Sequence, residues 1–203
     1  MRRRLLALSV ITMPSVLFGC ADTTTADSGQ PPVVSTTGSS QAPDDTTAPA
    51  GTPATVSDPA RPAFDELPVI PDGKASQTPC PYLDTQWVAD ANGQRVTGMG
   101  VDDRFDPVAC VFWSYPEDPQ LTVIVRHMDT AADAMAVVDW AAPVDTTNPT
   151  DEPAGWTGGR KGGDDGAVYA VAKDTVAVVV LSNQAQSIKT QIIAEKVIEN
   201  LHL

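Results

Sequence analysis

Regular patterns of apolar residues begin at about residue 78 and continue to the end of the chain. In one segment Leu121, Val123 and Val125 alternate with residues of a second face, which is the period of a half-buried strand. Five strands are predicted in this way, over 94–101, 108–115, 120–127, 167–172 and 176–181. The last of them is apolar on both faces, so we expect it in the centre of a sheet, covered on both sides.

Three other stretches repeat apolar residues every three or four positions, which predicts helices. They cover about 81–92, 131–142 and 184–201, and a Pro/Gly/Asp-rich loop is predicted over 143–166. The order is helix, three strands, helix, two strands, helix. It predicts a single α+β domain, with a mainly antiparallel sheet of about five strands and three helices packed on it.

The N-terminus has the layout of an export signal. Three arginines, Arg2 to Arg4, precede an apolar run from Leu5 to Phe18 that is too short to span a bilayer as a helix. The sequence Leu17-Phe18-Gly19-Cys20 resembles the bacterial lipobox, in which the cysteine receives a diacylglycerol and the chain is cut before it. We therefore predict a lipoprotein signal peptide over 1–19 and lipidation of Cys20; an ordinary secretory signal is the alternative.

Residues 20–77 are rich in Thr, Pro, Ser, Ala and Gly and show no sustained apolar period. Such a composition buries too little apolar surface to offset its ordering entropy, so it predicts a disordered tether between lipid and domain. Its Thr and Ser clusters suit O-glycosylation or an unmodified linker equally well. A small apolar cluster near its end, Phe64, Leu67, Val69 and Ile70, is expected to dock on the domain over 78–203.

The charge of the chain is strongly acidic. Its formal net charge is −13, and removal of the signal arginines would leave 10 basic and 26 acidic residues. Such a surface repels phosphate backbones, so nucleic-acid binding is disfavoured. The chain also carries no polybasic patch for anionic lipids, so contact with the membrane should come from the acyl chains. These features predict an extracytoplasmic protein held at the cell membrane by lipid.

Three cysteines are present. Once Cys20 is assigned to lipid, Cys80 and Cys110 remain as a pair in an oxidising compartment, which predicts a disulfide. Zinc binding is the weaker alternative, because two distant cysteines without nearby histidines supply too few ligands. No metal and no cofactor is expected.

Two further features are candidate contact sites. Gly155–Gly163 contains Arg160 and Lys161 among glycines and could form an anion cradle, although it lacks the Ser or Thr and the helix of a P-loop. A solvated flexible loop is the alternative. Trp140 falls opposite the apolar stripe of its predicted helix, where it either covers the 143–166 loop or forms an exposed anchor for a partner.

Catalytic chemistry is not indicated. The two histidines, His127 and His202, stand at a strand end and next to the last residue, and no serine lies in a Gly-x-Ser-x-Gly motif. With the two domain cysteines assigned to a bridge, we predict no catalytic residue and no enzyme activity.

Several short motifs together carry a family resemblance. They are Cys80-Pro81-Tyr82-Leu83, Asn92-Gly93-Gln94-Arg95-Val96, Ala109-Cys110-Val111-Phe112-Trp113, Gly155-Trp156, Ala167-Val168-Tyr169-Ala170-Val171 and Ser182-Asn183-Gln184 with Ser187. Over about 78–203 the chain resembles an uncharacterised lipoprotein domain family of actinobacterial cell envelopes, a domain of unknown function. The order of elements is more loosely similar to Mog1/PsbP-like sandwiches of other envelope lipoproteins, an analogy of fold and not of function.

The function expected from these features is that of a non-enzymatic binding or interaction module of the cell envelope, anchored by lipid and acting on an envelope protein or ligand. The alternatives are a carrier of an apolar, lipid-like ligand between sheet and helix, and an enzyme with a non-standard site. A large apolar cavity would favour the carrier, a filled core with an exposed apolar patch would favour the interaction module, and convergent titratable groups in a cleft would favour the enzyme.

Overall fold

The computed structural model describes residues 62–203, and the prediction of an α+β domain is confirmed. Seven antiparallel strands form one sheet in the order β1-β2-β3-β7-β6-β5-β4. The strands are β1 (Gly98–Asp102), β2 (Ala109–Trp113), β3 (Pro119–His127), β4 (Asn148–Thr150), β5 (Thr157–Gly163), β6 (Gly166–Lys173) and β7 (Val176–Ser182). The helices are α1 (Thr85–Asn92), α2 (Ala131–Ala141) and α3 (Ser187–Leu201), with a short 3-10 turn, η1, at Gly73–Ala75.

The predicted number of strands was wrong, because β4 and β5 lie inside the stretch expected to be a loop. Four of the seven residues of β5 are glycine, and glycine is disfavoured in strands on its own account. The packing requires it here: a Cβ at Gly158 would overlap the carbonyl oxygen of Ala170 on β6. The central position predicted for β7 is confirmed, since it is the fourth of the seven strands.

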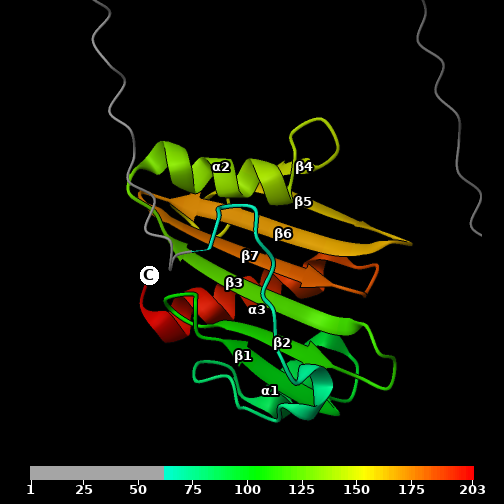
Figure 1. Cartoon of the computed structure of the whole chain (residues 1–203). Coiled ribbons are helices and arrows are strands. Elements are labelled where there is room, and N and C mark those ends of the chain that lie inside the picture. The colour runs from blue at the N-terminus through cyan, green and yellow to red at the C-terminus, as the bar shows by residue number, and fades with distance from the viewer. Residues whose placement is uncertain (1–61) are drawn as a thin grey trace, which may run out of the picture. The chain divides into compact units, whose positions relative to one another are not determined.

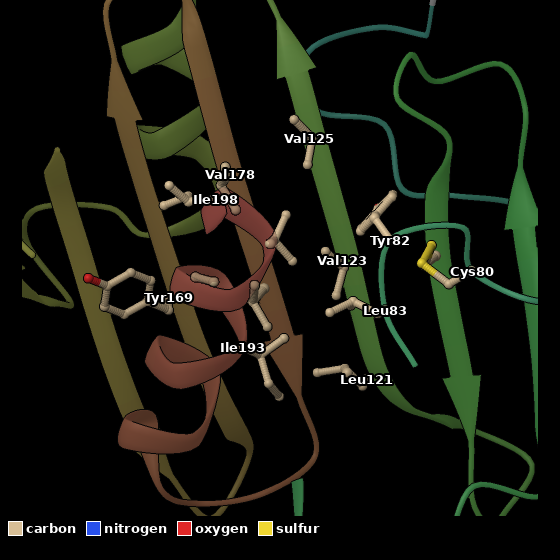
Figure 2. Close-up of a cluster of buried hydrophobic side chains, with 14 of the residues drawn as sticks. Cys80, Tyr82, Leu83, Leu121, Val123, Val125, Tyr169, Val178, Ile193 and Ile198 are labelled. Atoms are coloured by element: carbon tan, nitrogen blue, oxygen red, sulfur yellow. A yellow bond between two sulfur atoms is a disulfide. The ribbon is translucent and has the colours of Figure 1, made fainter. Parts of the chain in front are cut away.

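Helices α1 and α3 cover one face of the sheet and α2 covers the other (Figure 1). The first face holds the larger buried cluster, in which Val88 of α1 and Ile193 of α3 pack with Val123 and Val178 (Figure 2). The second cluster is built largely from small residues, among them Ala134 and Ala170, which let α2 approach the strands. Successive side chains of a strand point to opposite faces of the sheet, so the central strands contribute buried residues to both clusters.

A buried hydrogen-bond network fixes α1 on the sheet. The side-chain amide of Asn92, at the end of α1, donates to Gln120 Oε1 at 3.0 Å, and Ser182 Oγ donates to Asn92 Oδ1 at 2.7 Å. Gln120 donates in turn to the carbonyl of Trp113 at 3.1 Å. These three polar side chains lie at most 7% exposed, so the partners keep buried groups satisfied and hold α1 in one place.

Residues 62–77, which the sequence assigned to the tether, run across the α2 face over β1–β3 and are called the strap below (Figure 1). Two glycines of β1 make room for it: a Cβ at Gly100 would lie 2.6 Å from Ile70 Cγ2, and one at Gly98 would lie 2.5 Å from Lys74 Cγ. Ile70 of the expected apolar cluster is thus docked, whereas Phe64, Leu67 and Val69 are exposed.

The chain then passes around the edge of the sheet. Ser76 lies over Gly100 on the strap's face, whereas Cys80 bridges Cys110, whose side chain belongs to the cluster on the opposite face. The segment between them therefore covers the free edge of β1. At the other end of the sheet β4 is only three residues long and contains Pro149. Both edges are thereby protected against pairing with further strands.

Candidate functional site

The candidate site is an open groove of about 630 Å³ on the α1/α3 face of the domain. It lies where the segment that leads into α1 meets the end of α3. Its lining residues are Cys80, Pro81, Tyr82, Leu83, Asp84, Pro107, Asn200 and Leu201. The volume falls within the range of about 300–1,000 Å³ typical of ligand sites.

Three contacts hold the walls of the groove. The Cys80–Cys110 disulfide joins the entering segment to β2, with a Cα–Cα distance of 5.6 Å, which confirms the predicted pairing. Tyr82 donates its hydroxyl proton to the carbonyl of Val108 at 2.9 Å, and burial raises the pKa of this phenol. Asn200 of α3 donates to the Tyr82 carbonyl at 2.7 Å. The segment that forms one wall is thus tied to both the sheet and α3.

Two features of the groove supply hydrogen-bond acceptors. Asp84 caps α1, and one of its carboxylate oxygens accepts from the Trp87 amide at 2.8 Å. The last turn of α3 brings backbone carbonyls with a partial negative charge to the same place. Asp84 is the one Lys, Arg, Asp or Glu among the lining residues. The groove is therefore suited to a hydrogen-bond donor or a cation.

A second, smaller pocket of about 170 Å³ lies between the strap and the sheet. It is mainly apolar, and its lining residues are Leu67, Pro68, Ile70, Val111, Trp113, Pro119, Thr122 and Leu181. The strap is thus one wall of this pocket, and the pocket is on the opposite face of the sheet from the groove.

Polar contacts anchor the strap above this pocket. Arg126 of β3, 4% exposed, donates to the carbonyls of Ala63 at 2.8 Å and Pro62 at 2.7 Å. The carboxylate of Asp102 accepts from the Val69 amide at 2.7 Å and from Arg104 Nη2 at 2.7 Å. Arg104 in turn pairs with Glu66 of the strap.

Asp102 is ionised in this environment. Burial disfavours its charged form, but hydrogen bonds from the Arg104 side chain and from the amides of Val69 and Arg104 outweigh that effect and lower its pKa. This role of Asp102 was not predicted from the sequence. The paired aspartates at 102 and 103 were a signal of a polar site, but nothing in the pattern connects them to residues more than thirty positions earlier.

Arg160 and Lys161, the residues of the candidate anion cradle, lie on a strand and not in a loop. They are consecutive residues of β5, so their side chains point to opposite faces of the sheet. Arg160 is half-buried and donates to Gln191 of α3 at 2.9 Å, while Lys161 is exposed. The expectation of a loop is wrong, because pairing with β6 over the whole of β5 makes the segment part of the sheet. Contact of Arg160 or Lys161 with an anion or a partner stays a prediction.

The other predicted sites lie apart from the groove. Trp140 is half-buried near the end of α2, on the opposite face of the sheet, and it belongs to neither buried cluster. The predicted lipidation site, Cys20, lies outside the described residues. Within 62–203, no group of three or more His, Cys, Asp or Glu residues is arranged to hold a metal ion.

The fold and groove together define a class: an α+β domain with one antiparallel sheet, a buried apolar cluster on each face and an open groove. Comparison with known families gives a closer assignment. The profile of a family described as "Domain of unknown function (DUF2020)" matches residues 62–203, so the chain belongs to that family. The match includes the strap. No curated protein matches the chain.

No helix among residues 62–203 is both long and apolar enough to cross a membrane.

Proposed function

We propose that this protein is a non-enzymatic interaction module, tethered by lipid at Cys20 on the outer face of the cell membrane, whose groove binds an envelope protein. The observation that carries the proposal is the 630 Å³ groove, held open by the disulfide, Tyr82 and Asn200. The export-signal pattern and the Gly19-Cys20 junction support the anchor. The resemblance to actinobacterial envelope lipoproteins supports the same location.

The groove chemistry supports binding over catalysis. Cys80 is held in the disulfide, and the Tyr82 hydroxyl, whose pKa is raised by burial, is used as a donor to Val108. Neither side chain is available as a nucleophile. Asp84 is used as a helix cap. The same contacts that form the walls thus occupy Cys80 and Tyr82, and only one carboxylate oxygen of Asp84 is used by the cap.

A carrier of an apolar ligand is the second candidate function, and the apolar pocket beneath the strap favours it. At 170 Å³ this pocket is smaller than typical ligand sites of about 300–1,000 Å³, so a lipid would have to displace the strap. Saturable binding of a fluorescent fatty acid that is lost in Leu181→Arg would support this candidate. Binding unchanged by that substitution would count against the pocket.

Site-directed photo-crosslinking tests the proposed function. A photoreactive amino acid at Pro81 or Leu201, both in the groove, should crosslink one discrete protein in the native envelope. The matched control is Val144, which is 79% exposed and follows α2 on the opposite face. In a Cys20→Ser background the protein should leave the membrane fraction and lose the crosslink. Equal crosslinking from Val144, or unchanged membrane association without Cys20, would contradict the proposal.

A further inference from the structure

The groove carries a local excess of negative charge. Asp84 contributes a full charge, and the N-terminus of α1, which it caps, offsets about half of it. The C-terminus of α3 adds a smaller negative charge on the other wall, since the His202 amide caps the carbonyls of Ile198 and Glu199. Asp106 adjoins the lining residue Pro107 and is exposed. Glu199, next to Asn200, is paired with Lys196 and contributes little.

The net charge of the whole domain is also negative. Residues 62–203 contain 9 Lys and Arg against 21 Asp and Glu, a net charge of −12. Such a surface attracts a cationic partner over a distance of roughly one Debye length, about 8 Å at physiological salt. Attraction alone would act anywhere on the surface, so a specific contact needs a shaped site as well. Within the described residues the groove provides that shape.

The groove also has an apolar part beside its acceptors. Pro81 is exposed, and Pro107 and Leu201 are half-buried, so their hydrocarbon surfaces are accessible. Asp84 retains a second carboxylate oxygen with no hydrogen bond among residues 62–203, and the amide oxygen of Asn200 is likewise available as an acceptor. Donors in the ligand would therefore meet acceptors, and an adjacent aliphatic side chain would meet Pro107 and Leu201.

We infer that the groove binds a cationic peptide segment, with a lysine or arginine side chain at Asp84 and an aliphatic neighbour against Leu201 and Pro107. The inference rests on the proposed function and specifies the chemistry of its partner. A cationic group matches the carboxylate and the α3 carbonyls, and the aliphatic neighbour distinguishes the groove from the other acidic surfaces of the domain.

Three labelled peptides of equal length test the inference by fluorescence anisotropy on the purified full chain. The first alternates lysine with leucine, the second replaces each lysine by glutamine, and the third replaces each leucine by glycine. We expect the first to bind more tightly than either of the others and its affinity to fall as salt rises.

A matched pair of protein variants separates the groove from the general acidity. Asp84→Asn removes the groove charge but keeps a residue that caps helices as well as aspartate. Asp139→Asn makes the same change of net charge on α2, on the other face. We expect Asp84→Asn to weaken the lysine–leucine peptide about fivefold, the size of an exposed ion pair of about 1 kcal/mol. Asp139→Asn should change the affinity by less than about twofold, and neither variant should lose its melting transition.

Equal weakening by the two variants would overturn the inference, because it would show attraction to the whole surface. Failure of every peptide to bind would also overturn it. Equal binding of the glutamine peptide, with crosslinking from Pro81 and Leu201 still present in the native envelope, would overturn the cationic partner alone and leave the proposed function standing.

Discussion

At the residue scale, Asp102 is the clearest case of a side chain whose role depends on distant partners. It is 3% exposed and joins β1 to the strap through the Val69 amide, while Arg104 extends the same link to Glu66. A buried carboxylate without these donors would be costly. Burial raises the pKa of Asp102, but hydrogen bonds from the Arg104 side chain and then from the Val69 amide lower it below its ordinary value. The docked strap therefore supplies part of the stabilisation of the charged form, through Val69.

This coupling predicts a pH dependence of strap docking. Because the pKa of Asp102 is lower in the folded protein than in the unfolded chain, its contribution is fully present above the ordinary value of about 4 and is lost as pH falls through the folded value. The protection factor of the Val69 amide, which is its intrinsic exchange rate divided by the observed one, should therefore fall below about pH 4. Asp102→Asn should show faster exchange already at pH 7 and a loss of about 1–3 kcal/mol in unfolding free energy.

Asp103→Asn is the control for this prediction, since Asp103 is the exposed neighbour on the same turn. It should leave both Val69 exchange and stability nearly unchanged. If the protection factor of the Val69 amide changes neither with pH nor in Asp102→Asn, the carboxylate does not hold the strap.

At the scale of elements, the strap and the glycines of β1 form one packing unit. Gly100 leaves space for Ile70 and Ser76, whose nearest atoms belong to side chains. Gly158 on β5 has a different surrounding, because the atoms that a Cβ would overlap there belong to the backbone of β6. A side chain can move aside, whereas the sheet backbone cannot without breaking its ladder.

We therefore predict different outcomes for two equivalent substitutions. Gly100→Ala should loosen the strap and lower the unfolding free energy by about 1–3 kcal/mol, the usual cost of overpacking. Limited proteolysis should then cut between residues 62 and 77 while the rest of the domain stays resistant. Gly158→Ala should destabilise the whole sheet, seen as a larger fall in melting temperature and general protease sensitivity. Identical proteolysis patterns would contradict the distinction.

At the scale of the whole molecule, one disulfide joins the segment that follows the strap to the sheet. The disulfide closes a sequence separation of 30 residues between the segment that covers the edge of β1 and the strand β2. On the chain-entropy account such a bond restricts the unfolded chain and stabilises the folded one by about 3 kcal/mol. It also fixes the wall of the groove at Cys80.

The double substitution Cys80→Ala with Cys110→Ala should therefore cost about 3 kcal/mol and lower the melting temperature by roughly 10 °C. Calorimetry gives the temperature, and circular dichroism should show the fold retained. Peptide affinity at the groove should fall as well, since its wall loses an anchor. A melting temperature unchanged by the substitution would show that Leu83, Val88 and the buried Asn92 network hold this region without the bond.

The sequence by itself determined the features that depend on the local period of apolar residues and on the number of cysteines. Alternation identified β3 and the hairpin of β6 and β7, the two-sided apolar run placed β7 in the centre, and the count of cysteines paired Cys80 with Cys110. The strands and helices could be predicted because apolar residues recur on a buried face, at every second residue of a strand and at every third or fourth residue of a helix. The candidate contacts Arg160, Lys161 and Trp140 had no such support.

Only the tertiary structure decided the remaining features. Strand β5 is glycine-rich, so its local preference opposes a strand, and close approach to β6 and to Ala142 overrides that preference. The strap contains no regular spacing of apolar residues. Its position depends on Arg126 and Asp102, which belong to strands far along the chain. The groove combines Asp84 with Leu201 across more than a hundred residues. Contacts of this kind depend on three-dimensional packing, which no local pattern of apolar and polar residues specifies.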